Sequence, residues 1–308
     1  MSDMPPLPRG WLRVVEAARH AEAIKAILDT PPIAPRDDGL VLFAEIGSAQ
    51  LLPCLVAIKS LHARLGRGRV ALLDDGTLIG SDRAVLAQHC GDPEIIVAPG
   101  SDDTGLSDLP GWRALATVLE RRSSEYWLWL SGDGVTLGPV PEVERAVALN
   151  ASFLMPQDQV PGEPIPLADF CRATYPDGPV DSEIAARLES RLGGIERPGW
   201  RYLRSDSGLM GFAAGGPGLR SAAACRADLE QLVAPEDLCD ADAARVAASL
   251  LLASENRTVI LPHNRYGHAS TASWDIGTSF LHFSDDARHA DARYAEASQT
   301  AIAALLSQ

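Results

Sequence analysis

Residues 40–47 read LVLFAEIG, an apolar run of strand length that ends at Gly47. A helical pattern follows through Leu65, with Ser48 as a candidate N-cap. Apolar runs and helical patterns then alternate in the order 69–73, 82–89, 94–97, 112–122 and 126–130. Four strands separated by helices are typical of a parallel sheet with helices on both faces. The sequence therefore predicts an α/β fold with a mostly parallel, twisted sheet.

The rest of the chain is expected to contain further helices and strands. We predict an N-terminal amphipathic helix over 11–29, which Pro31 and Pro32 stop. The stretch 156–179 is crowded with Pro, Gly and Asp, which predicts a long loop or lid. Beyond it we expect helices at 181–192, 218–232, 242–253 and 290–306, and strands at 200–203, 209–213, 259–261 and 279–283. The whole chain, 1–308, is expected to form one domain, with a helical extension over 1–36 and two halves at 37–150 and 151–308.

The charge of the chain excludes some classes of partner. The chain of 308 residues has 27 Lys and Arg and 41 Asp and Glu, which gives a formal charge of −14. Such a surface repels nucleic acid phosphates and anionic lipid, so no nucleic acid partner is expected. No apolar run approaches the roughly 20 residues that span a bilayer, so no integral membrane segment is expected either. The start has no signal-peptide pattern, and the cytoplasm is the expected location.

Common catalytic motifs are absent, and the informative residues are polar groups that follow strands. The chain has no Gly-Lys dipeptide, no HExxH and no GxSxG, which excludes Walker-type NTPases and the commonest hydrolases. Glu45, Asp74-Asp75 and Ser131-Gly132-Asp133 each come at the end of an apolar run. In doubly wound sheets ligands bind outside these strand ends. A carboxylate there suits a divalent cation on a diphosphate, although Asp and Gly are also ordinary turn residues.

Four segments occur in the order found in one enzyme family. Residues 129–138, WLSGDGVTLG, resemble the Asp-x-Asp region of nucleotide-sugar-dependent glycosyltransferases of the GT-A fold. Residues 69–78 are similar to the second strand of that fold and its Asp-Asp-Gly turn, and residues 207–212 are similar to its acceptor-side strand. Residues 280–283, FLHF, resemble the C-terminal His-Phe segment of retaining members related to lipopolysaccharide glycosyltransferases.

The resemblance implies a GT-A-like fold and a glycosyltransferase of the hexosyltransferase type. The half at 37–150 would bind a nucleotide diphosphate sugar, a UDP-sugar above all, and the half at 151–308 an unidentified glycan or small-molecule acceptor. In this interpretation Asp133 and His282 hold Mn²⁺ or Mg²⁺. The residues implied for the nucleotide sugar are Glu45, Asp74, Asp75, Arg113, Ser131 and Asp133, and those on the acceptor side are Asp206, Ser207, Gly208 and Trp274.

The chain also departs from the family pattern. Ser131 stands where the family has the first Asp of Asp-x-Asp, and a neutral hydroxyl weakens metal binding because it supplies no charge. Asp206 stands where the family tends to have Asn, and it either replaces the lost acid or sits in a turn. His263, Arg265 and His268 form an anion-binding loop or a plain surface loop.

Two alternative functions therefore stay open. The first is a catalytically degenerate GT-A scaffold that binds a nucleotide, a glycan or a protein without turnover. The second is a nucleotidyltransferase, which usually needs a Gly-rich first loop that carries Lys or Arg, whereas residues 45–48 supply one Gly.

Overall fold

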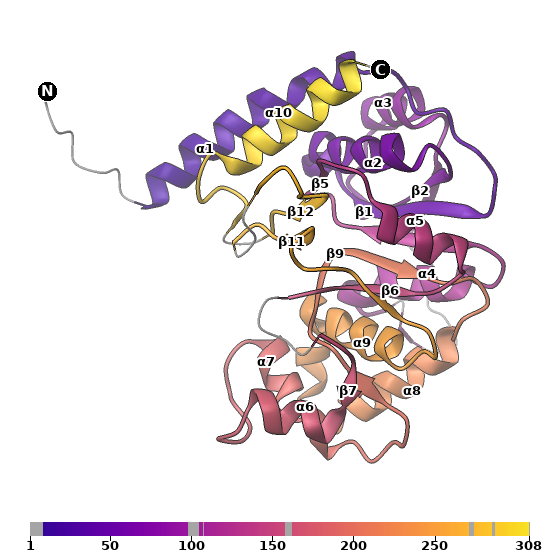
Figure 1. Ribbon diagram of the computed structural model, residues 1–308, viewed down its shortest axis with the longest axis vertical. Coiled ribbons are helices and arrows are strands. Elements are labelled where there is room, and N and C mark those ends of the chain that lie inside the picture. Colours follow the sequence, from indigo (N-terminus) through magenta and orange to yellow (C-terminus); the bar gives the residue numbers. More distant parts are fainter. Residues whose placement is uncertain are drawn as a thin grey trace, which may run out of the picture.

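A seven-stranded sheet forms the centre of the protein (Figure 1). The computed structural model describes residues 9–97, 105–106, 108–157, 162–270, 274–284 and 287–307. Neighbouring strands run parallel except at β9, which is antiparallel to both of its neighbours. The predicted α/β class with a mostly parallel sheet is therefore confirmed. In spatial order the strands are β10 (Val259–Ile260), β6 (Phe153–Pro156), β9 (Ser205–Phe212), β4 (Tyr126–Leu130), β1 (Leu40–Ile46), β2 (Arg69–Asp74) and β3 (Glu94–Val97).

Two apolar cores lie on opposite faces of this sheet because successive side chains of a strand point to opposite sides. In β1, Leu40, Leu42 and Ala44 join one core, whereas Val41 and Phe43 join the other. The first core includes side chains of α2 (Leu51–Leu65), α3 (Gly80–Cys90), α5 (Pro141–Ala148) and α10 (Arg293–Leu306). The second includes α4 (Arg113–Arg121), α8 (Leu219–Leu229) and α9 (Ala241–Ala253), and Figure 1 shows these helices on the other side of the sheet from α2 and α3.

A small second sheet sets the position of the C-terminal His-Phe segment. It consists of β11 (Tyr266–His268), β12 (Phe280–His282) and β5 (Gly134–Thr136). Strand β5 follows the 131–133 turn directly, and its Gly134 pairs with His282. A Cβ at Gly134 would lie 2.6 Å from the ring of Phe280, so this close pairing depends on glycine. The pairing brings His282 beside the turn that follows β4.

The stretch 156–179 is more ordered than the sequence predicts. It contains β7 (Ile165–Pro166), which pairs with β8 (Arg201–Tyr202), and the helix α6 (Leu167–Thr174). Leu167 and Phe170 are buried and anchor α6 in the second core, which explains why a Pro-rich stretch is helical here. The prediction of a continuous loop is wrong for this part, and residues 158–161 lie outside the described residues. The helix α7 (Ile184–Glu189) follows.

The N-terminal helix is present, but its inner face is polar. It consists of α1 (Arg9–Ala23) and the 3₁₀ turn η1 (Ile24–Asp29), and α1 packs along α10 (Figure 1). Ile24 and Ile27 are buried as expected, whereas Trp11 is 67% exposed. The inner face of α1 carries His20, whose ring stacks on Tyr294 of α10 at 3.6 Å between centroids. The apolar positions of α1 therefore face outward because the helix covers polar groups.

The remaining elements are short 3₁₀ turns, namely η2 (Ser48–Gln50), η3 (Pro110–Trp112), η4 (Leu192–Gly194) and η5 (Pro235–Cys239). No helix in the described parts of the chain is both long and apolar enough to cross a membrane. The division of the chain into halves at residue 150 stays a prediction.

Candidate functional site

A cleft of about 860 Å³ opens at one edge of the main sheet. Parallel strands β1 and β4 end at this edge, and antiparallel β9 begins there. Residues from both predicted halves line the cleft, and among them are Glu45, Ser131, Asp133, Asp206, Ser207 and His282. The structure thus brings these six residues singled out from the sequence, and His268 as a seventh, into one cavity.

Glu45 forms an electrostatic group with two other predicted residues. Partial exclusion of water in the cleft wall raises the pKa of the Glu45 carboxyl, and the nearby Asp75 raises it further. Arg113, at the first position of α4, acts in the opposite direction. The start of α4 is fixed by Trp112, whose indole N–H donates to the carbonyl of Leu238 at 2.7 Å. Glu45, Asp75 and Arg113 therefore lie close together at the carboxyl ends of β1 and β2.

The two neighbouring aspartates of the second strand have different environments. The buried Asp74 accepts hydrogen bonds from the N–H groups of Gly76 at 2.8 Å and Leu78 at 3.3 Å, and it forms an ion pair with Arg83. Asp75 is exposed, and its Oδ1 accepts hydrogen bonds from the N–H and the hydroxyl of Thr77. Asp74 thus stabilises the turn, which leaves Asp75 as the carboxylate that faces solvent. A nucleoside contact by either residue stays a prediction.

Ser48 lies next to this turn but is not a helix N-cap. The N-cap of η2 is Gly47, and the Ser48 hydroxyl donates to the carbonyl of Thr77 at 2.6 Å. The Ser48 side chain therefore joins the turns after β1 and β2.

Asp133 is engaged by the C-terminal part of the chain. Its carboxylate forms an ion pair with Arg288, and the hydroxyl of Tyr294 donates to its Oδ1 at 3.1 Å. The Asp133 side chain is 9% exposed, so the guanidinium neutralises a charge that is nearly removed from water. The Ser131 hydroxyl accepts a hydrogen bond from the N–H of Asp133 at 3.2 Å, which closes the turn. The role of Asp133 as a metal ligand stays a prediction, and its carboxylate already has a cationic partner.

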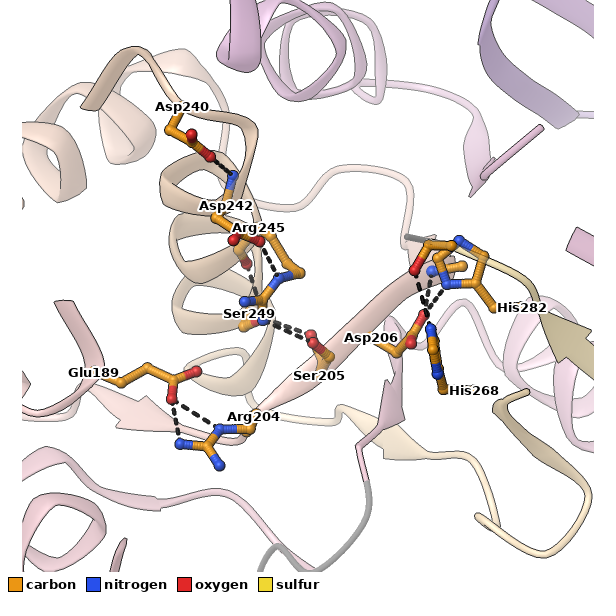
Figure 2. A network of polar contacts seen from close by, with 12 residues as sticks. Glu189, Arg204, Ser205, Asp206, Asp240, Asp242, Arg245, Ser249, His268 and His282 are labelled. Atoms are coloured by element: carbon orange, nitrogen blue, oxygen red, sulfur yellow. Dashed lines mark hydrogen bonds and ion pairs between the residues drawn. The ribbon is translucent and has the colours of Figure 1, made fainter. Parts of the chain in front are cut away.

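A separate cluster of metal-ligating side chains lies in the same cleft. Asp206 of β9, His268 of β11 and His282 of β12 offer ligand atoms that all lie within 4.8 Å of one another. Figure 2 shows the carboxylate of Asp206 pointing toward the two imidazole rings. The Nδ1 atom of His282 lies 2.6 Å from Oδ1 of Asp206, and both side chains are buried.

The local backbone holds Asp206 in this position. The N–H of Gly208 donates to Oδ1 of Asp206 at 2.6 Å. A Cβ at Gly208 would lie 2.6 Å from Cβ of His282, so a larger residue would push the imidazole away. Burial alone would raise the pKa of the Asp206 carboxyl. The charge and hydrogen bond of His282, the Gly208 N–H and the charge of His268 together hold that pKa below its usual range.

Other residues singled out from the sequence lie elsewhere. Trp274 is partly buried and packs against the first apolar core, and it is not among the cleft-lining residues. Arg265 donates to Glu142 at 2.6 Å and to the Ser279 hydroxyl at 2.7 Å, which ties its loop to α5 and to the residue before β12. The sequence places His268 in a loop with Arg265, whereas the structure places its side chain in the cleft.

A second polar network includes Glu189, Arg204 and Tyr175 of the cleft lining and has no sequence motif. Glu189 accepts hydrogen bonds from the hydroxyls of Tyr202 at 2.8 Å and Tyr175 at 2.9 Å, and it forms an ion pair with Arg204. Figure 2 shows this pair together with Arg245, which donates to Asp242 on its own helix, α9, and to the carbonyl of Ser205 on β9. Arg204, Arg245 and Arg288 all line the cleft, so three guanidinium groups face it.

Comparisons with known proteins give structural matches. No protein-family model matches the chain, and no curated protein matches it. The chain is similar to glycosyltransferases of known structure. An active-site mutant of LgtC is 12% identical with a TM-score of 0.49, and the match covers 84% of this chain and 94% of that chain. The galactosyltransferase LgtC in complex with donor and acceptor sugar analogues is 14% identical, with 84% and 95% covered and a TM-score of 0.46.

Mouse xyloside xylosyltransferase 1 is a further match, with 10% identity, 80% of this chain and 98% of that chain covered, and a TM-score of 0.42. Sequence identities this low show similarity in the arrangement of strands and helices alone.

Proposed function

We propose that the protein transfers a sugar from a nucleotide diphosphate sugar, a UDP-sugar first, to a hydroxyl of a glycan or small molecule. The observation that carries this proposal is the composition of the cleft. Residues assigned to the donor from the sequence, such as Glu45 and Asp133, line the same cavity as residues assigned to the acceptor, such as Asp206 and Ser207. Transfer requires that donor and acceptor meet in one cavity at close range.

The guanidinium groups in the cleft lining are the groups that would meet a diphosphate leaving group. In the transfer the bond between the sugar and the diphosphate breaks, a bond to the acceptor oxygen forms, and negative charge grows on the leaving phosphate. Planar guanidinium groups bind phosphate oxygens in pairs and stabilise that charge. Arg204, Arg245 and Arg288 line the cleft, where each is ion-paired with a carboxylate of the lining, namely Glu189, Asp242 and Asp133, so a bound phosphate would share a guanidinium with one of these acids. The nucleoside would lie toward Glu45 and Asp75, at the ends of β1 and β2.

A second function is favoured by one observation at Asp133. The ion pair between Asp133 and Arg288, together with Ser131 in place of an acid, removes the oxygen ligands on which the family pattern depends. A scaffold that binds a nucleotide or a glycan without turnover would tolerate this change. In either case we expect the protein to act in the cytoplasm, as the sequence predicts.

Release of nucleoside diphosphate from a panel of UDP- and GDP-sugars tests the proposal. The full-length protein is compared with Ser207→Trp, which fills the cleft, and with Ser182→Trp at an exposed position outside it. We expect release by the wild type and by Ser182→Trp, and a loss of release in Ser207→Trp. Nucleotide binding without release would favour a nucleotide-binding scaffold. If the protein shows no nucleotide binding and no release, the transfer function is refuted, and the alternative that is left is a scaffold for a glycan or a protein.

A further inference from the structure

Three strands bring two imidazoles and one carboxylate to a single point in the cleft. Asp206, His268 and His282 are separated by as many as 76 residues in the chain, yet their ligand atoms all lie within 4.8 Å of one another. Bonds of about 2.0–2.2 Å to one ion place ligand atoms roughly 3.5 Å apart. An ion would hold Nδ1 of His282 and Oδ1 of Asp206, now 2.6 Å apart, at this wider spacing and would draw any more distant pair inward. We propose that Asp206, His268 and His282 bind a transition-metal dication.

The strands that carry the histidines are held in register by backbone pairing. His268 of β11 pairs with His282 of β12, so both side chains belong to the same row of the small sheet. Their rings lie 5.7 Å apart between centroids in an edge-to-face arrangement. A sheet position fixes a ligand more precisely than a loop position does, which lowers the entropic cost of metal binding.

Hydrogen bonds from neighbouring groups orient the ligands. The two ring nitrogens of His268 lie 2.6 Å from the Ser270 hydroxyl and 3.0 Å from the Ser284 hydroxyl. One hydroxyl gives up its nitrogen when an ion binds there, and the other keeps the orientation of the ring. Such outer contacts are typical of histidine ligands in metal proteins. On the acid side, the N–H of Gly208 holds the Asp206 carboxylate toward the histidines.

The donor atoms determine which ions fit. Two nitrogens and one oxygen suit Zn²⁺, Co²⁺ and Fe²⁺, whereas Mg²⁺ prefers oxygen ligands throughout. This site differs from the one that the sequence resemblance implies, because Asp133 is bound by Arg288 and Tyr294. Three protein ligands leave coordination positions open to the cleft. That one of these positions takes a diphosphate oxygen rests on the proposed function, but the metal site itself stands on the three side chains.

Calorimetric titration of the full-length protein with Zn²⁺, Co²⁺ and Mg²⁺, after removal of bound ions with a chelator and without any nucleotide, tests the site. We expect one Zn²⁺ and one Co²⁺ per chain and binding of Mg²⁺ that is weaker by at least about tenfold. Asp206→Asn and His268→Gln should each weaken Zn²⁺ binding by at least about tenfold. The controls are His263→Gln, a histidine five residues before His268, and Asp133→Asn, and both should bind Zn²⁺ like the wild type.

Three outcomes would overturn the inference: no Zn²⁺ or Co²⁺ binding to the wild type, unchanged binding in Asp206→Asn and His268→Gln, or a loss confined to Asp133→Asn. Circular dichroism checks the fold of each variant. If Asp206→Asn does not fold because Asp206 is buried, Zn²⁺ binding by His268→Gln, at a half-buried position, decides the test. Failure of this inference is distinct from failure of the proposed function, since metal binding is measured without nucleotide and nucleotide release is measured separately.

Discussion

Acidification should destabilise the protein through His20, which lies buried between α1 and α10. The residue is only 4% exposed. Its ring stacks on Tyr294, and its Nε2 atom lies 3.2 Å from the Ser298 hydroxyl. Burial lowers the pKa of His20 from 6.5 to about 3, and the nearby His289 and Arg288 also lower it. Between pH 6.5 and 3 the unfolded chain therefore binds a proton that the folded protein does not bind. Stability contributed by this group is present above pH 6.5 and is lost as the pH falls through that window.

The magnitude follows from the width of the window. A pH of 5 lies 1.5 units below 6.5, the pKa of this histidine in the unfolded chain. At about 1.4 kcal/mol per unit, the free energy of unfolding therefore falls by about 2 kcal/mol. Urea unfolding of the wild type and of His20→Gln at pH 7.5 and pH 5.0 measures it, because glutamine keeps a hydrogen-bonding group and does not titrate. Histidines with lowered pKa values away from His20, such as His62 and His89, affect both proteins equally. We expect the wild type to lose about 2 kcal/mol more than His20→Gln, and equal losses would refute the reasoning.

Three further substitutions test the cleft. Gly208→Ala should displace His282, since the new Cβ would lie 2.6 Å from the histidine Cβ. We expect Zn²⁺ affinity to fall at least about tenfold and the free energy of unfolding in urea to fall by about 1–3 kcal/mol. Gly80→Ala, with open space around it, should change neither. Glu189→Gln should cost about 3 kcal/mol in urea unfolding because it removes the charge that neutralises the partly buried Arg204 guanidinium. It also replaces one of the two acceptor oxygens by an NH2 group that cannot accept from a tyrosine hydroxyl. A cost below about 1 kcal/mol would contradict this. Arg288→Gln should weaken UDP binding in calorimetry and destabilise the fold by about 2 kcal/mol. This cost is smaller than that of breaking a fully buried ion pair because the Arg288 side chain is 35% exposed. Unchanged UDP affinity would remove Arg288 from the proposed donor site.

Most strands of the central sheet were predictable from sequence because they are apolar runs, but β6 (Phe153–Pro156) was not predicted. The predicted strands at 69–73, 94–97 and 126–130 match β2, β3 and β4 to within one residue. Strands β5 and β11 were not predictable in the same way, since three residues are too few to show a period. The helix α6 was hidden because the prolines and glycines around it outweigh the two buried side chains that anchor it.

The candidate site was predictable only in part because local sequence patterns do not show long-range contacts. Residues that follow strands, such as Glu45 and Asp133, lie in the cleft because parallel strands end at a common edge. The partners of these residues depend on long-range contacts. Arg288 meets Asp133 across 155 residues, and no local motif marks it. His282 was predicted as a metal ligand with Asp133, whereas its nearest acid in the structure is Asp206, which a sequence pattern could assign only to a turn or to a replacement acid.

Photolabelling with an azido-UDP-sugar tests most directly whether the large cleft is a nucleotide-sugar site. The protein is irradiated with and without excess UDP, digested, and the labelled peptides are identified by mass spectrometry. A smaller hollow of about 420 Å³, lined among others by Trp200 and Arg220, provides an internal comparison. We predict label that UDP displaces on peptides carrying Glu45, Asp75 or Arg113. Displaceable label confined to the Trp200 hollow, or no displaceable label at all, would contradict the account.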